Sequence, residues 1–237
     1  MVAMKDTSGA RTYRGVEAAQ RLAGRRNRLL AAGLELLGGE RQDVSSVTVR
    51  KVCGHAGLAA RYFYESFTDK NEFVAAVFDW VVSDLAATTQ AAVAAVPTDE
   101  QTRAGMANIV RTITEDARVG HLLFSTRLAN PVIARKRAES SALFAMLSGQ
   151  HVGETLRLPA NDRIRAAAHF VVGGVGQTIS AWLAGDVRLE PDQLVDQLAA
   201  LLNELAEPHL YRLTETAAHA TASSRDPADT NASWSGA

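Results

Sequence analysis

The chain has 237 residues, of which 47% are hydrophobic and 22% are charged, and its formal net charge is −1 at pH 7. This composition is typical of a globular protein of one or two domains. The single cysteine, Cys53, excludes an intrachain disulfide framework and a multi-cysteine zinc site. Because the N-terminal sequence also has no apolar core of a secretion signal, we expect a cytoplasmic protein.

The charge is distributed unevenly along the chain. Residues 1–70 contain 12 Lys and Arg and 7 Asp and Glu, a balance of +5, whereas the remainder has a balance of −6. A nucleic-acid-binding module needs positive charge only where it faces phosphate. The asymmetry therefore favours a nucleic-acid-binding head on a body of a different kind, although chance variation of surface charge is an alternative.

Apolar residues recur with helical spacing along most of the chain, and no segment alternates as a strand would. The first predicted helix runs from about Leu22 to Leu37 and ends at Gly38. Upstream, residues 1–20 are predicted to form a basic flexible arm.

In that arm, Arg11 and Arg14 are possible contacts to the DNA backbone or the minor groove. A solvated tail that makes no contact is the alternative.

A short helix, a tight turn and a second short helix are predicted next. Thr48 stands at the N-cap position of the short helix, and Gly57 stands where the chain must turn sharply. The apolar stripe between them has the spacing i, i+3, i+4, i+7 and consists of Val49, Val52, Cys53 and Ala56. This order of elements is that of a helix-turn-helix.

The second short helix is predicted over residues 59–67. A step of about 100° per residue places Phe63 and Phe67 on one face, where they would hold the helix to its scaffold. Arg61 and Tyr62 lie on the opposite face, with Tyr64 at its flank. We expect this open face to contact DNA, and ordinary surface tyrosines are the alternative interpretation.

These residues also define a resemblance. TVRKVCGHAGLAARYFYESFTDKNEFVAAVF resembles the helix-turn-helix of the TetR family of bacterial transcriptional regulators, and RRNRLLAAGLELL resembles the family's first helix. The resemblance covers about residues 11–80. Ala59 departs from it, because the family usually has a Ser or Thr N-cap there, and the linker from Leu37 to Thr48 is longer than usual. The predicted DNA-binding residues are Thr48, Arg50, Arg61, Tyr62, Tyr64 and Lys70.

The body is predicted to be helical as well, so the fold class is all-α: a helix-turn-helix domain over residues 21–70 and a helical ligand-binding and dimerisation domain over 71–212. The tail, 213–237, has no periodicity and is expected to be disordered. The predicted body helices lie at 71–96, 99–115, 117–128, 131–149, 162–184 and 192–206.

One body segment, residues 166–185, has no formally charged side chain over 20 residues. A membrane span is one interpretation, but a helix covered by protein on several sides explains the same composition. Its glycines, 173, 174 and 176, do not follow a strand, so they are interpreted as sites of close helix contact rather than a phosphate loop. We expect a homodimer with a four-helix interface, as the resemblance also implies. Its predicted residues are Val171, Gly174, Val175, Thr178, Trp182, Leu194, Leu198, Leu201 and Leu205.

No catalytic or metal-binding motif is present, so no enzyme activity, catalytic residue, metal or cofactor is expected. Cys53 is interpreted as core filler, with redox sensing as the alternative. The body is predicted to bind a small apolar or amphipathic ligand. The candidate pocket residues are Met106, Phe124, Phe144, Met146, His169, Gln177 and Trp182.

Together with the resemblance, these features predict a repressor that binds a palindromic double-stranded DNA operator as a homodimer and is released by the ligand. A helical small-molecule-binding protein or enzyme without specific DNA binding is the alternative.

Overall fold

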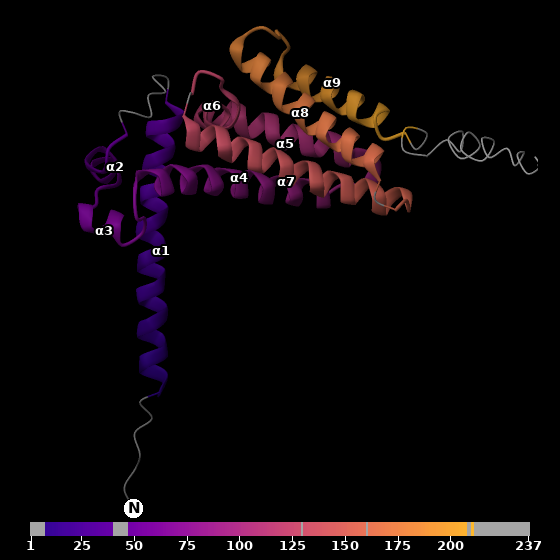
Figure 1. The fold of residues 1–237 in the computed structure, drawn as a ribbon. Coiled ribbons are helices and arrows are strands. Elements are labelled where there is room, and N and C mark those ends of the chain that lie inside the picture. The colour runs from indigo at the N-terminus through magenta and orange to yellow at the C-terminus, as the bar shows by residue number, and fades with distance from the viewer. Residues whose placement is uncertain (1–7, 40–46, 129, 160, 208–209, 211–237) are drawn as a thin grey trace, which may run out of the picture.

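The computed structural model describes residues 8–39, 47–128, 130–159, 161–207 and 210, without the side chains of residues 8–18, 151 and 155. The regular elements within these ranges are all helical (Figure 1). They are α1 (Ser8–Gly38), α2 (Val49–Ala56), α3 (Ala60–Tyr64), α4 (Lys70–Ala94), the 3-10 helix η2 (Thr98–Glu100), α5 (Gln101–Glu115), α6 (Ala117–Phe124), α7 (Pro131–Leu156), α8 (Asp162–Ala184) and α9 (Pro191–Glu204).

The helices form a head, α1–α3, and a body, α4–α9. In the head, α2 and α3 pack beside α1. In the body, α4 packs against α5 and α7, while α8 packs along α7 and α9 along α5. Figure 1 shows α1 crossing the long body helices, with its N-terminal half projecting away from them.

The first helix is longer than its apolar stripe predicts. It begins at Ser8 rather than near Leu22, so a flexible arm over residues 1–20 is wrong for residues 8–20. Residues 8–21, upstream of Leu22, contain three Ala and three Arg, which favour helix even without a face to bury. The side chains of Arg11 and Arg14, and all of residues 1–7, lie outside the described part of the chain.

Three other boundaries differ from the sequence prediction. Helix α6 ends at Phe124 rather than at residue 128. Helix α3 spans Ala60–Tyr64 rather than 59–67, and Phe67 follows it in a turn. Helix α7 continues past Gly149 to Leu156 and ends with Arg157 in a left-handed conformation, φ 53°. The sequence predicts that Gly149 ends this helix, but the residue lies within it. A Cβ at Gly149 would lie 3.6 Å from both Ala168 and Ile164, so the glycine allows close packing of α7 on α8.

One hydrophobic core extends from the head into the body. Phe63 and Phe67 of the head share it with Phe73 of α4, Leu122 of α6 and Ile133 of α7. We expected a domain boundary near residue 70, but the packing is continuous there. A second core cluster joins α5, α8 and α9.

None of the described helices has both the length and the apolar composition needed to cross a bilayer. The described residues also contain no group of three or more His, Cys, Asp or Glu side chains that could hold a metal ion.

Candidate nucleic-acid interface

Helix α2 and the turn after it are set by local hydrogen bonds. The Thr48 side chain accepts a hydrogen bond from the Lys51 amide at 3.3 Å, which caps the start of α2. At the other end Gly57 adopts φ 63° and ψ 38°, a left-handed conformation that favours glycine. The Leu58 amide then donates to the Cys53 carbonyl at 2.9 Å, which turns the chain into α3.

Three phenylalanines hold α3 in place, and we call them the phenylalanine cluster: Phe63, Phe67 and Phe73. Their exposed fractions are 1%, 2% and 0%, and their ring centroids lie 5.1 to 5.4 Å apart. The Arg26 guanidinium stacks on Phe67 at 4.4 Å and donates to the Ser66 carbonyl at 2.8 Å. The cluster therefore fixes which side of α3 faces away from the protein.

The outward side of α3 presents Arg61 and Tyr64. Arg61 is exposed, and Tyr64 has an exposed fraction of 62%. Thr48 and Arg50 are exposed on the first turn of α2, and Lys70 is half-buried at the start of α4. Four of these five predicted residues therefore have exposed side chains, and Lys70 is partly accessible.

Tyr62 lies elsewhere than predicted. Its ring is half-buried and faces α1 instead of sharing the outward face with Arg61. The Arg25 guanidinium stacks on the ring at 4.6 Å and the Arg61 guanidinium at 4.7 Å, while Arg61 also donates to the Tyr62 hydroxyl at 2.7 Å. Helical periodicity gives the angle of Tyr62 on α3, but it does not show that α1 passes beside it.

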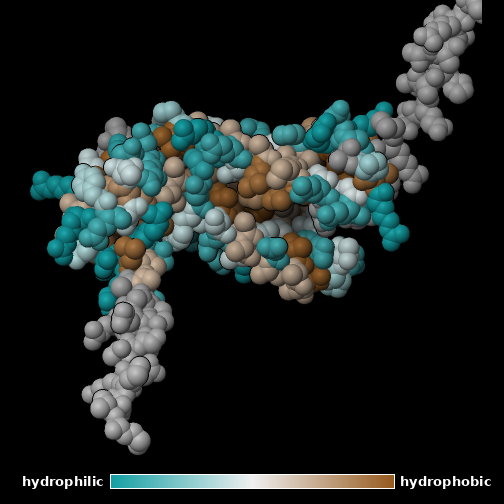
Figure 2. Space-filling view, turned by 60° about the horizontal axis from the view of Figure 1, so that its bottom comes forward, coloured by the Kyte–Doolittle hydropathy of each residue, from teal (hydrophilic) through white to brown (hydrophobic). Residues whose placement is uncertain are grey.

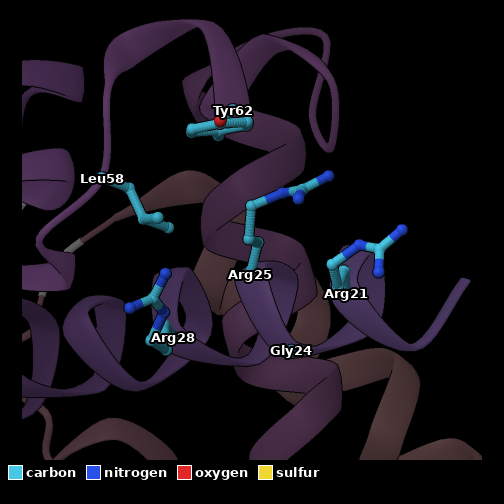
Figure 3. A pocket seen from close by; sticks show the side chains of 6 residues that line it. All are labelled: Arg21, Gly24, Arg25, Arg28, Leu58 and Tyr62. Atoms are coloured by element: carbon cyan, nitrogen blue, oxygen red, sulfur yellow. The ribbon is translucent and has the colours of Figure 1, made fainter. Parts of the chain in front are cut away.

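Tyr62 forms one wall of an open groove between α1 and the α2–α3 turn. Figure 3 shows three arginines of α1 beneath the Tyr62 ring, with Leu58 at the side. The groove has a volume of about 520 Å³, and its lining residues are Arg21, Gly24, Arg25, Arg28, Leu58 and Tyr62. The positive charge of residues 1–70 does not by itself locate this groove, although the spacing 21, 25, 28 places these arginines on one helix face.

Helix α3 begins without a side-chain cap. Ala59 occupies the N-cap position and makes no capping hydrogen bond, as the sequence predicts. We expect Ala59→Ser to raise the free energy of unfolding by about 1 kcal/mol, because a hydroxyl would satisfy an exposed amide of the first turn. Urea denaturation of both proteins measures the difference, and an unchanged or lowered midpoint would contradict it.

Cys53 lies in the head core with an exposed fraction of 5%, and burial raises the pKa of its thiol. We expect a thiol reagent to label the native protein much more slowly than the urea-unfolded chain, because the thiolate is the reactive form. The raised pKa also means that the thiol's contribution to stability is present below the ordinary pKa of about 8.5 and declines above it. Equal labelling rates would contradict this placement and favour a redox role.

A junction between α1 and α6 connects the head to the body. His121 Nδ1 lies 2.9 Å from the Gly38 carbonyl oxygen, and Arg118 forms an ion pair with Glu35 at 3.7 Å. Arg118 also pairs with Asp116 at 2.8 Å, which lowers the pKa of the Asp116 carboxyl. These contacts join the C-terminal end of α1 to α6.

The predicted pocket residues do not converge on one cavity. Met106, Phe124 and Trp182 pack against the second core cluster, and the Trp182 indole donates to the Leu189 carbonyl at 2.8 Å. Phe144 is half-buried on α7.

The side chains of Met146, His169 and Gln177 are exposed on the protomer, and their assignment to a ligand pocket stays a prediction. Helices α7 and α8 have apolar or small residues on several sides, so periodicity does not identify their inner faces.

The predicted dimer residues also differ in exposure: some are buried inside the protomer and others are half-buried or exposed. Leu194 and Leu198 are 0% and 2% exposed because α9 packs on α5, so their assignment to an interface is wrong. Val175 and Trp182 also pack against the second core cluster. The half-buried positions are Val171, Thr178 and Leu205, and the exposed ones are Gly174 and Leu201.

The outward side of α8 presents Phe170, with an exposed fraction of 68%, and Gln177. A Cβ at Gly173, Gly174 or Gly176 would meet no atom within 4 Å, so these glycines make no close contact inside the protomer. In Figure 2, hydrophobic side chains gather over the middle of the body and hydrophilic ones surround them.

No protein-family model matches the sequence, and no curated protein matches it. Solved structures are similar in fold. A TetR-family transcriptional regulator from Rhodococcus sp. is 12% identical, with a TM-score of 0.65 over 78% of this chain and 100% of that one. The transcriptional regulator FadR from Bacillus subtilis, in complex with stearoyl-CoA, is 15% identical, with a TM-score of 0.57 over 74% and 96%.

AibR, in complex with isovaleryl coenzyme A and operator DNA, is 15% identical, with a TM-score of 0.52 over 75% of this chain and 97% of that one. These identities are low, but the similarity extends over both the head and the body. The chain therefore has the all-helical fold of TetR-family transcriptional regulators.

Proposed function

We propose that this protein is a ligand-responsive transcriptional regulator that binds operator DNA through α3. One observation supports the proposal most strongly: the phenylalanine cluster fixes α3 so that Arg61 and Tyr64 face away from the protein. A helix presented in this way can enter the major groove, where arginine reads guanine and the tyrosine ring can contact a thymine methyl.

The residues around α3 have the chemistry of phosphate contacts. Thr48 has a hydroxyl, and Arg50 and Lys70 have cationic groups, on the elements that precede and follow α3 in the chain. Such contacts set the position of a recognition helix on the duplex without reading sequence. The positive balance of residues 1–70 adds general attraction to DNA.

We propose a homodimer, because two heads are needed to read a palindrome with half-sites about 34–36 Å apart. Exposed apolar side chains of the body are available for such contact. They are Leu143, Met146 and Leu147 of α7, Phe170 of α8 and Leu201 of α9.

We further propose that a small apolar or amphipathic ligand binds the body and releases the DNA. The similar structures that contain stearoyl-CoA and isovaleryl coenzyme A make acyl-CoA thioesters the first ligands to test. The α1–α6 junction at Gly38 and His121 provides a path from the body to the head. A ligand that favours a shifted α6 would change the head separation and lower DNA affinity.

Fluorescence anisotropy tests the proposal. The parent protein is titrated into labelled DNA from upstream of its own gene and into a random-sequence duplex, with and without acyl-CoA. We expect specific binding at least about a thousandfold tighter than the random level, with two protomers per site. Equal affinity for both duplexes would reject the function and favour a helical ligand-binding protein without specific DNA recognition.

A further inference from the structure

The groove between α1 and α3 is lined by three arginines of α1. Arg21, Arg25 and Arg28 follow one face of α1 toward Tyr62 (Figure 3). Arg25 is an ion-pair partner of Glu65, at 3.6 Å, and stacks on Tyr62. Three arginines therefore line the groove beside the helix that we propose to enter the major groove.

The groove combines cationic groups with apolar walls. Leu58 supplies an apolar wall and Tyr62, with Arg25 stacked on its ring, lines the other side, while the arginines supply planar donors that suit phosphate oxygens. A deoxyribose–phosphate segment has this same pairing of an apolar sugar and an anionic group. A single-stranded base would need an open aromatic face, but both Arg25 and Arg61 stack on Tyr62.

We propose that this groove binds the sugar–phosphate backbone of the DNA strand that flanks the major groove entered by α3. The proposal rests on the proposed function and adds a second contact surface to it. Arg21 and Arg28 contact phosphate oxygens, and Arg25 is a positioning residue that holds the Tyr62 ring in place as the groove wall. Arg61, which also stacks on Tyr62, is the residue that we propose to read the major groove.

Gly24 provides a direct way to test the groove without removing an arginine. It lies between Arg21 and Arg25 and lines the groove, and a Cβ there would meet no atom within 4 Å. Gly24→Glu therefore adds a negative charge where the phosphate would bind, and Gly24→Gln adds the same bulk without charge. Glutamate and glutamine have nearly the same helix propensity, and each has a higher helix propensity than glycine.

The experiment measures anisotropy of the full-length Gly24→Glu, Gly24→Gln and Arg28→Gln variants. The probes are the labelled upstream DNA and a random duplex of about 30 base pairs, from about 0.05 to 0.2 M salt. We expect Gly24→Glu and Arg28→Gln to weaken binding to both duplexes by a similar factor, on the order of tenfold. Each phosphate contact contributes about 0.9 to the steepness of log K against log salt. Arg28→Gln removes one contact from each protomer, so in a dimer the slope should become less steep by about 1.8.

Gly24→Gln should bind more tightly than Gly24→Glu, and thermal melting of all variants should match or exceed that of the parent. Parent-like affinity and salt slope for Gly24→Glu and Arg28→Gln would overturn the groove proposal. So would a loss confined to the upstream DNA, because that is the behaviour of a base contact. If the parent prefers its upstream DNA while the variants give either of these two results, the groove proposal fails and the proposed function stands. If the parent shows no preference, the function and the groove fall together.

Discussion

Phe63→Ala should lower the free energy of unfolding by about 3–5 kcal/mol, which is most of the stability of many domains. The Phe63 side chain is 1% exposed and packs between Phe67 and Phe73, with ring centroids 5.4 and 5.3 Å away. Its removal leaves a cavity in the phenylalanine cluster and removes three aromatic contacts, to Phe67, Phe73 and Tyr64. Because α3 spans only five residues, it has little stability apart from this packing.

Tyr64→Ala is the matched control for this variant. Tyr64 is the next aromatic residue of the same helix, but its side chain is 62% exposed and contacts Phe63 edge-on at 5.5 Å. Its loss should lower stability by no more than about 1 kcal/mol. Urea denaturation followed by circular dichroism measures both variants, and similar losses for the two would show that the cluster does not hold α3.

Gly38→Ala is the second substitution for which we expect a large effect. A Cβ at Gly38 would lie 2.5 Å from the Arg118 carbonyl oxygen and 2.8 Å from the Arg118 Cα. These are backbone atoms of α6, so no side-chain rotation relieves the clash, and α1 must move away from α6. We expect a loss of about 1–3 kcal/mol or more, as for other overpacked sites, together with weaker specific DNA binding because the head is displaced.

Gly54→Ala separates this clash from the general effect of replacing a glycine. A Cβ at Gly54 would meet no atom within 4 Å, and the residue lies inside α2. Alanine should therefore raise stability by up to about 1 kcal/mol there. Thermal melting and DNA anisotropy are measured for both variants, and parent-like stability of Gly38→Ala would mean that the α1–α6 junction is not tightly packed.

The helix-turn-helix is predictable from sequence because its signals are local. The Thr48 cap, the left-handed Gly57 and the inward Phe63 all depend on residues within a few positions of one another. The structure has each of them where the pattern predicts it. The all-helical class is predictable for the same reason, since helical periodicity is a local property.

Features that depend on contacts between distant segments were not predictable. Tyr62 faces α1 because Arg25, 37 positions earlier, stacks on it. Leu194 has the spacing of an interface residue, but it is buried because α9 lies on α5. Periodicity defines the faces of a helix, and only the tertiary arrangement decides which face meets the core, a partner or solvent.

The central claim is that α3 presents Arg61 and Tyr64 to a DNA duplex. The most direct test is the anisotropy of the Arg61→Ala, Tyr64→Ala double variant on the upstream DNA, beside a random duplex. We predict a loss of about a hundredfold or more on the upstream DNA, since each base contact contributes about 1–3 kcal/mol, with a much smaller change on the random duplex. A double variant that folds like the parent and binds its upstream DNA as tightly would contradict the claim.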